Sequence, residues 1–242
     1  MRTLAVIPAR FASRRFPGKP LVKILDKPMI QWVWEAVVKA TSINSAAIAT
    51  DDERIAKTAI GFGARVVMTS PDHVSGSDRV AEVARKARVG FVVNIQGDEP
   101  LLEPSVIDAV VEALQRDSEA DIATPVTHIE EEEARNPDVV KVVVDRKGKA
   151  LYFSRALVPY PARHQTTFLR HIGIYAFRKY ALLNFVRQGP STLERIEGLE
   201  QLRALEMGMK IKAVSVKFTS CSVDRPEDVP VVEKLMREKG LG

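Results

Sequence analysis

The sequence predicts an α/β protein with a doubly wound, mostly parallel, Rossmann-like sheet and a small antiparallel extension in its second half. Two observations carry this prediction. Short apolar, β-branched segments alternate with helical segments through the first 126 residues, and such alternation favours parallel strands joined by right-handed crossovers. After residue 130 the pattern changes to paired strands separated by turn residues, which is typical of antiparallel pairing.

The elements of the first part follow one another in regular order. The predicted strands are 4–7, 46–50, 65–68, 91–95 and 122–126. The predicted helices between them are 29–40, 52–62, 78–87 and 105–116. Pro28 and Pro104 stand where a first helical residue is expected, and Asp51 and Ser77 are the predicted N-caps.

The second part begins with a short acidic helix at 130–133. Its other predicted elements are a hairpin of 139–144 and 150–153 around Asp-Arg-Lys-Gly, a strand at 168–177, a helix from the capping box at 191–194 to about Leu205, a strand at 211–216 and a last helix from Pro226. These elements predict a mixed insertion that extends the main sheet.

Composition limits the class of protein. The 242 residues are 45% hydrophobic and 28% charged, with a formal net charge of +5, which is a globular balance. The single cysteine, Cys221, excludes an intrachain disulfide and a cysteine zinc site, and it suits a reducing compartment. No apolar run approaches the ~18 residues of a membrane span, and 4–9 is too short for a signal-peptide core. We therefore expect a cytoplasmic protein without membrane contact.

A basic loop follows the first predicted strand. Between Arg10 and Lys27 the chain has six cations and one acid, Asp26, together with Pro17 and Gly18, which disfavour a helix. We expect these cations to converge on an anion. The alternative is a basic surface loop that only increases solubility.

Two aspartates accompany this loop. Asp98 directly follows the strand at 91–95, and in open parallel sheets ligands bind beyond the carboxyl ends of the strands. Asp224 precedes the last helix, where N-capping is the alternative interpretation. Cations for a triphosphate beside two carboxylates are coherent with a divalent ion such as Mg²⁺ between them.

Two familiar nucleotide-binding motifs are excluded because the chain lacks residues that they require. Gly18-Lys19-Pro20 has neither the leading glycine nor the hydroxyl of a P-loop, and the loop has only one of the three glycines of a dinucleotide fingerprint. Kinases, GTPases and ordinary dehydrogenases are therefore disfavoured.

Seven segments carry a resemblance. In chain order they are the loop at 7–21, the segment 72–79, Gln-Gly-Asp-Glu-Pro at 96–100, and the segments 151–155, 168–175, 199–203 and 223–228. The sequence resembles the nucleotide-sugar cytidylyltransferases. The resemblance covers nearly the whole chain for the members that act on the eight-carbon sugar acid 3-deoxy-manno-octulosonate (Kdo).

This resemblance implies a nucleotidyltransferase version of the Rossmann-like fold and a set of site residues. The implied CTP-binding residues are Arg10, Ser13, Arg15 and Lys19 at the phosphates, with Lys19 nearest the α-phosphate, and Ser77 and Arg79 at the base. Asp98 and Asp224 are the implied metal ligands, and with Lys19 and Arg10 they form the catalytic set. The family often has Thr-Glu-Arg where this chain has Ser-Asp-Arg, so it departs from the pattern at Ser77.

The implied sugar-acid pocket contains Gln96, Arg155, His171, Tyr175, Glu200 and Gln201. A sugar acid needs cations or donors for its carboxylate, which Arg155 and His171 offer, and acceptors for its hydroxyls, which Glu200 and Gln201 offer. Spacing predicts that Glu197, Glu200 and Gln201 share one helix face. By residue type alone, a structural role is the commoner interpretation of each.

The resemblance implies transfer of CMP from CTP to the anomeric hydroxyl of Kdo, with release of pyrophosphate, one or two Mg²⁺ ions, a homodimer and a place in lipopolysaccharide biosynthesis. It also implies a single domain over 1–242, with a CTP-binding half at 1–128 and a sugar-acid-binding and dimerisation half at 129–242. The alternatives are a cytidylyltransferase for another sugar acid, such as a sialic acid, and a basic nucleic-acid-binding protein. Nucleic acid is disfavoured because aromatic residues are only 6% of the chain and the cations cluster at one strand end.

Overall fold

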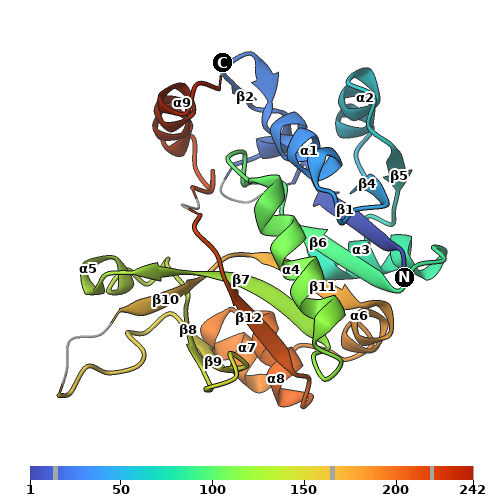
Figure 1. The fold of residues 1–242 in the computed structure, drawn as a ribbon. Helices are drawn as coiled ribbons and strands as arrows, with labels where there is room; N and C mark the ends of the chain where they lie inside the picture. Colours follow the sequence, from blue (N-terminus) through green and yellow to red (C-terminus); the bar gives the residue numbers. More distant parts are fainter. Residues whose placement is uncertain (13–15, 164–166, 219–220, 242) are drawn as a thin grey trace. The chain divides into compact units, whose positions relative to one another are not determined.

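Four strands pair in parallel in the order β5-β4-β1-β6 (Figure 1). Their bounds are β1 (Thr3–Ala9), β4 (Ser45–Thr50), β5 (Val66–Met68) and β6 (Phe91–Ile95). β1 and β6 are central and almost wholly buried. Burial on both faces explains why they read as continuous apolar runs. The four predicted strands are confirmed to within two residues at each end.

The computed structural model describes residues 1–12, 16–163, 167–218 and 221–241. Its chain divides into two compact units, unit 1 (Met1–Asp108 with Thr219–Gly242) and unit 2 (Ala109–Phe218). These compact units differ from the predicted functional halves, which meet at residue 128. The chain passes from one unit to the other inside α4 (Pro104–Arg116), and its last segment belongs to unit 1 again.

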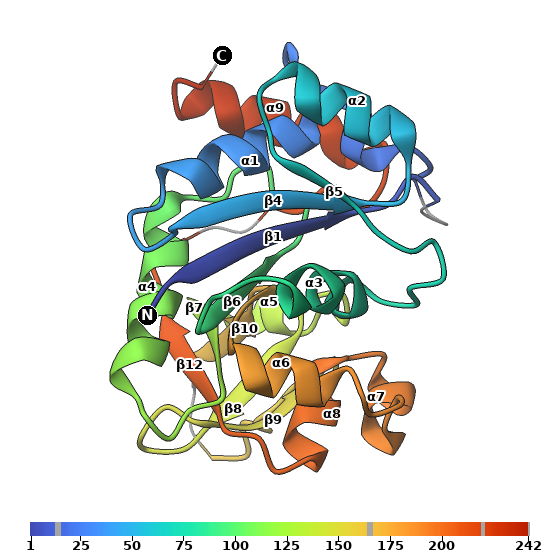
Figure 2. The same ribbon diagram turned by 90° about the vertical axis from the view of Figure 1, so that its right-hand side faces the viewer.

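Helices cover both faces of the sheet in unit 1. α1 (Met29–Lys39) and α2 (Glu53–Gly61) lie on one face, and α3 (Gly76–Arg85) lies on the other (Figure 2). The predicted helices are confirmed to within two residues. Two predicted N-caps are wrong.

The correct caps are Asp52 and Ser75. Asp52 accepts hydrogen bonds from the first turn of α2. The Ser75 side chain and the Asp78 carboxylate each accept from the other residue's backbone N–H, which forms a capping box. Asp51 instead pairs with Arg79.

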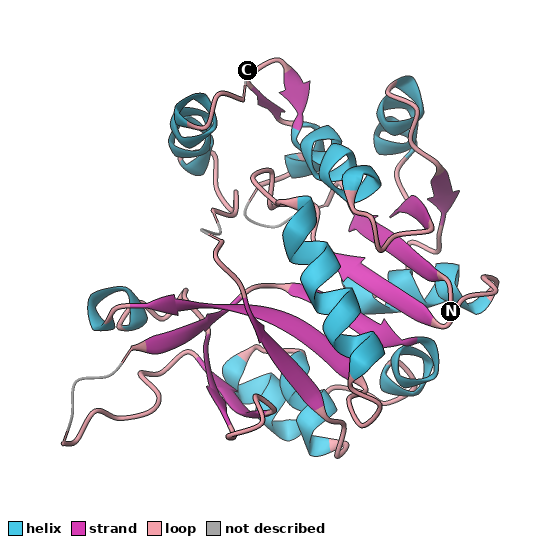
Figure 3. Ribbon diagram, in the orientation of Figure 1, coloured by secondary structure: helices cyan, strands magenta, loops and turns pink. Residues whose placement is uncertain are grey.

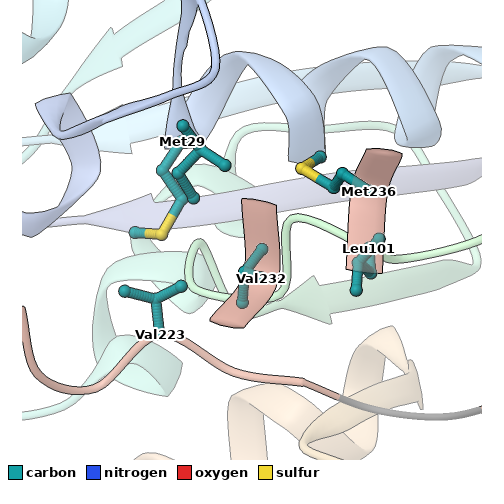
Figure 4. Packing of buried hydrophobic residues seen from close by; sticks show 6 residues of the cluster. Met29, Leu101, Val223, Val232 and Met236 are labelled. Atoms are coloured by element: carbon teal, nitrogen blue, oxygen red, sulfur yellow. The ribbon is translucent and has the colours of Figure 1, made fainter. Parts of the chain in front are cut away.

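A small hydrophobic cluster anchors the last segment of the chain in unit 1. α9 (Asp228–Glu238) places Val232 and Met236 against Met29 and Leu101, and Val223 closes the cluster (Figure 4). The short hairpin β2 (Lys23–Ile24) and β3 (Lys27–Pro28) adds Ile24 to the same core. Burial of Val223 fixes the backbone beside Asp224. The last helix begins at Asp228, two residues after the predicted start.

Unit 2 is built around β7 (Ile122–Ile129), which pairs antiparallel with its neighbours β10 and β11 and parallel with β12 (Figure 3). The other strands are β8 (Lys141–Val144), β9 (Ala150–Ser154), β10 (Phe168–His171), β11 (Ile174–Arg178) and β12 (Ile211–Ser215). The helices are α5 (Glu131–Ala134), α6 (Lys179–Phe185), α7 (Thr192–Glu197) and α8 (Gln201–Glu206). The predicted α/β fold with an antiparallel extension is confirmed.

Two predicted elements of unit 2 are broken. The strand at 168–177 is interrupted at Ile172 and Gly173, so that β10 pairs with the end of β7 and β11 with its beginning. The helix predicted from 191 to 205 stops at Gly198, whose φ of +66° is left-handed. Glu197, Glu200 and Gln201 therefore do not share one helix face.

In the described parts of the chain, no helix combines the length and apolar character that crossing a bilayer requires.

Candidate active site

A pocket of about 500 Å³ lies in unit 1, beyond the carboxyl ends of β1 and β6. It is lined by residues of four sequence segments, Pro8, Ala9, Arg10, Ala12, Lys19, Pro20, His73, Ser75, Gly76, Arg79, Gln96, Gly97, Asp98 and Asp224. Its position is the one where open parallel sheets bind ligands.

The loop after β1 folds back on itself through Gly18. The Gly18 N–H donates to the Phe11 carbonyl at 2.9 Å, and Gly18 has a φ of +74°, which favours glycine. The Arg54 guanidinium covers the Phe11 ring, 3.4 Å from its centre. Lys19 follows at once as the first residue of a short 3₁₀ helix, η1 (Lys19–Leu21). The hydrogen bond between Gly18 and Phe11 therefore helps to fix the position of the Lys19 backbone.

Asp98 and Asp224 are brought together by a backbone hydrogen bond. The Val223 N–H donates to the Asp98 carbonyl at 2.9 Å, so the two aspartates belong to adjacent stretches of chain. The Lys19 ammonium donates to both carboxylates, at 2.7 Å to Asp98 Oδ2 and at 3.3 Å to Asp224 Oδ1. The structure thus places the three predicted residues in one cluster.

Capping does not explain Asp224. Its own N–H donates to the Asp228 carboxylate at 2.7 Å, and the N–H of Arg225 does so at 2.8 Å. Asp228 therefore satisfies the donors before α9, while the Asp224 carboxylate contacts Lys19.

The charges of this cluster fit a divalent cation. One ammonium and two carboxylates carry a formal charge of −1, and their side chains are 15%, 26% and 37% exposed, so they remain accessible from the pocket. No group of three or more His, Cys, Asp or Glu side chains in the described residues is placed to hold a metal. Two carboxylates completed by substrate phosphates and water are the donor set that Mg²⁺ usually takes.

The other predicted nucleotide residues occupy different positions. Arg10 is exposed and lines the pocket, whereas Ser13 and Arg15 lie outside the described residues. Arg79 lines the pocket but is only 3% exposed. Its guanidinium donates to Thr69 Oγ1 at 2.5 Å and pairs with Asp51 at 3.3 Å. This pairing holds Arg79 rigidly in the pocket wall.

Ser77 is buried in α3, where its hydroxyl accepts a hydrogen bond from Asn94 Nδ2 at 3.2 Å. Asn94 Oδ1 in turn accepts from Gln96 Nε2 at 3.4 Å. Gln96 was predicted to contact the sugar acid, and it lines the unit 1 pocket together with Asp98. A polar chain therefore runs from the pocket wall into α3.

The remaining predicted sugar-acid residues lie in unit 2. The Tyr175 hydroxyl donates to Gln201 Oε1 at 3.1 Å, and the Tyr175 and His171 rings pack 5.3 Å apart. Burial, with the Glu200 charge as a smaller cause, raises the pKa of Tyr175 far above its ordinary value. Tyr175 is therefore a neutral donor.

His171 is neutral as well. It lies at the end of β10 and is edge-on to Phe153, with ring centres 5.1 Å apart. Burial lowers the pKa of His171 to about 3. His171 was predicted to offer a cation or a hydrogen-bond donor to a carboxylate, and as an uncharged ring it offers hydrogen bonds only.

Arg155 is held by its neighbours. Its Nε donates to the Glu197 carbonyl and its Nη1 to the Pro137 carbonyl, both at 3.0 Å. The Glu197 carboxylate accepts from the Arg155 N–H at 3.0 Å and from the Ser154 hydroxyl at 2.6 Å. Burial opposes ionisation of Glu197, but these bonds and nearby cations outweigh it and lower its pKa.

Glu200 stands beside a buried ion pair. Arg203 makes two 2.8 Å bonds to the Glu194 carboxylate and a longer contact of 3.4 Å to Glu200 Oε1. The Glu194–Arg203 pair links α7 to α8 across Gly198. Glu200 and Gln201 are therefore presented by a bend between two short helices.

The low pKa of His171 has a consequence for acid stability. The unfolded chain binds a proton near pH 6.5, whereas the folded chain does so only near pH 3. The stabilisation is complete above about pH 6.5 and is lost as the pH falls toward 3. We expect the free energy of unfolding to fall between pH 5.5 and 4 by up to about 1.4 kcal/mol per pH unit more in the wild type than in His171→Gln. Urea unfolding at several pH values measures both slopes, and equal slopes would contradict the burial of an uncharged ring.

Comparison with known proteins gives the family. A profile of the family described as Cytidylyltransferase matches residues 4–211. A 3-deoxy-manno-octulosonate cytidylyltransferase of Syntrophotalea carbinolica is 48% identical over 98% of this chain and 99% of its own. A relative of the same name from Arabidopsis thaliana, described as mitochondrial, is 46% identical over 99% of this chain and 85% of its own. The chain belongs to the cytidylyltransferase family.

Solved structures agree with this membership. CMP:2-keto-3-deoxy-manno-octonic acid synthetase, solved in complex with CTP, has a TM-score of 0.95 and is 38% identical, and the match covers 99% of this chain and all of that one. A cytidylyltransferase from Leptospira borgpetersenii, with a TM-score of 0.68 and 15% identity, shares the fold. The match covers 98% of this chain and 87% of the Leptospira chain.

Several residues of this cytidylyltransferase escaped the sequence analysis. His73 was given no predicted role, yet it lines the pocket and lies 2.5 Å from the Glu82 carboxylate. Asn94 left a signal, because it is the one polar residue in the apolar strand Phe-Val-Val-Asn-Ile. Thr124 in β7 had no recognisable sequence signal, since threonine is common in strands.

Proposed function

We propose that this cytidylyltransferase transfers CMP from CTP to the anomeric hydroxyl of Kdo, giving CMP-Kdo and pyrophosphate. The observation that carries the proposal is the Lys19 ammonium between the carboxylates of Asp98 and Asp224 in the unit 1 pocket. The names of its relatives, which are 43–48% identical over almost the whole chain, point to the same substrate. Its product would serve lipopolysaccharide biosynthesis.

In this proposal the unit 1 pocket binds CTP. Lys19 and Arg10 bind phosphate oxygens, as do Ser13 and Arg15, and Lys19 stabilises the charge that develops on the α-phosphoryl group. Ser77 and Arg79 form the base-reading wall. The sugar hydroxyl attacks the α-phosphorus in line, a new P–O bond forms, pyrophosphate leaves, and the hydroxyl proton passes to solvent.

The sugar acid is assigned to the polar residues of unit 2. Arg155 supplies positive charge for the carboxylate, and the Tyr175 hydroxyl, which donates to Gln201, accepts a hydrogen bond from a sugar hydroxyl. Glu200 and Gln201 accept hydrogen bonds from hydroxyl groups. Arg155 is held by Glu197, Glu200 contacts Arg203, and Tyr175 bonds to Gln201 before any substrate arrives, which reduces the entropy lost on binding.

Asp98 and Asp224 are the residues we assign to one or two Mg²⁺ ions. Bound Mg²⁺ supplies neutralisation of phosphate charge and lowers the pKa of a coordinated hydroxyl. We also propose a homodimer, as the family resemblance implies, and a cytoplasmic site of action, where CTP is available. None of these assignments requires a nucleic acid or a membrane.

A substrate panel tests the proposed function. Four nucleoside triphosphates are assayed for pyrophosphate release with Kdo and with a sialic acid, with Mg²⁺ and after its removal by EDTA. We expect turnover only with CTP, Kdo and Mg²⁺, and recovery of turnover when Mg²⁺ is restored. Preference for a sialic acid would move the chain to another branch of the family, and full activity in EDTA would refute the metal assignment.

A further inference from the structure

The Thr124 hydroxyl in unit 2 makes three polar contacts. It lies 2.8 Å from the Ile174 carbonyl oxygen, 3.2 Å from that of Ile172 and 2.9 Å from His171 Nε2. Thr124 is fully buried on β7, where β10 and β11 separate. The hydroxyl is shielded from bulk solvent, and its single hydrogen serves one of these three contacts.

The donors and acceptors around Thr124 determine which contact receives its hydroxyl hydrogen. A hydroxyl donates once and accepts through two lone pairs, and a carbonyl oxygen only accepts. The Ile172 oxygen already receives the Ile174 N–H at 2.7 Å. If the hydroxyl donated to His171, no proton would separate its oxygen from the Ile174 oxygen 2.8 Å away. The Thr124 hydroxyl therefore donates to Ile174.

The hydrogen in the His171 contact then belongs to the ring. Nε2 carries a proton and donates it to Thr124 Oγ1. Because burial keeps the ring uncharged, Nδ1 has no proton and offers a lone pair. Within the described residues, no protein group makes a hydrogen bond to Nδ1.

We infer that Thr124 is a positioning residue that fixes the Nε2–H tautomer of His171, so that Nδ1 accepts a hydrogen bond from a hydroxyl group of the sugar acid. This inference rests on the proposed function for its ligand, whereas the tautomer itself stands on the protein contacts. It assigns His171 to hydroxyl recognition. The substrate carboxylate is left to Arg155, whose Nη2 has no protein acceptor among the described residues.

Nitrogen-15 NMR of the histidine rings in the substrate-free enzyme tests the tautomer. The chain has four histidines, and the His171 signals are those lost in His171→Gln. We expect a protonated Nε2 and an unprotonated Nδ1 in the wild type and in Thr124→Ser, and loss of that pure tautomer in Thr124→Val. A protonated Nδ1 in the wild type would overturn the inference, whether or not Thr124→Val folds.

Kinetics test the role in recognition. Thr124→Val should raise KM for Kdo by about tenfold, the effect of one hydrogen bond, and change KM for CTP less than twofold. Thr124→Ser should restore KM for Kdo. An unchanged KM for Kdo in a Thr124→Val enzyme that has lost the tautomer would refute the acceptor role. An enzyme with the expected tautomer but no use of Kdo would instead refute the proposed function.

Discussion

Replacing Asp98 by asparagine should lower kcat by about 10²–10³-fold, the magnitude typical of removing one preorganised electrostatic group from a reaction centre. The amide has nearly the shape of the carboxylate but no negative charge. The substitution therefore removes one of the two anionic oxygens assigned to the metal, and it takes from Lys19 its 2.7 Å partner. Pyrophosphate release at saturating CTP, Kdo and Mg²⁺ measures the loss.

The fold should survive this substitution because the Asp98 side chain is partly exposed, and because the Asp98 bond to Val223 uses the main-chain carbonyl. Asp26→Asn is the matched control, since Asp26 is an exposed aspartate of the same unit. It should keep wild-type kcat. Near-normal Mg²⁺-dependent turnover in Asp98→Asn would show that Asp98 is not a metal ligand.

Replacing Lys19 by methionine should lower kcat/KM for CTP by a similar factor of about 10²–10³. Methionine keeps the length of the side chain but not its charge. The α-phosphoryl group then loses the cation assigned to it, and two carboxylates are left facing each other without the ammonium. Lys23→Met, an exposed lysine on β2, is the control and should stay within twofold of the wild type. Equal losses in the two variants would mean that only the overall basic charge of the loop matters.

Much of the fold could be predicted because its local signals agree. Buried parallel strands appear as apolar runs, and Ser75 with Asp78 marks the helix start that was predicted at Ser77. The errors arose where a local helix-end signal was overlooked or where tertiary contacts override the local pattern. Gly198 ends a helix that the capping box begins correctly, and the break after His171 is fixed by hydrogen bonds to β7.

The site was predictable in its residues but not in their partners. Asp98 could be identified by its position at a strand end. For Asp224, helix capping was an equally good explanation from sequence, but in the structure the Asp228 carboxylate accepts the hydrogen bonds before α9. The charge of His171 could not be predicted, because the pKa depends on burial by Phe153 and Tyr175 from other strands. The pKa of a buried group depends on residues that are distant in the sequence, so it cannot be predicted from the local sequence.

The central claim is that Asp98 and Asp224 share one cation position, held by the Lys19 ammonium in the free enzyme. Electron paramagnetic resonance of Mn²⁺, which takes the same oxygen ligands as Mg²⁺, tests it most directly in the absence of CTP. Lys19→Met should bind Mn²⁺ several-fold more tightly than the wild type because the competing ammonium is gone, and Asp98→Asn should bind it more weakly. Equal Mn²⁺ affinity in all three proteins would contradict the claim.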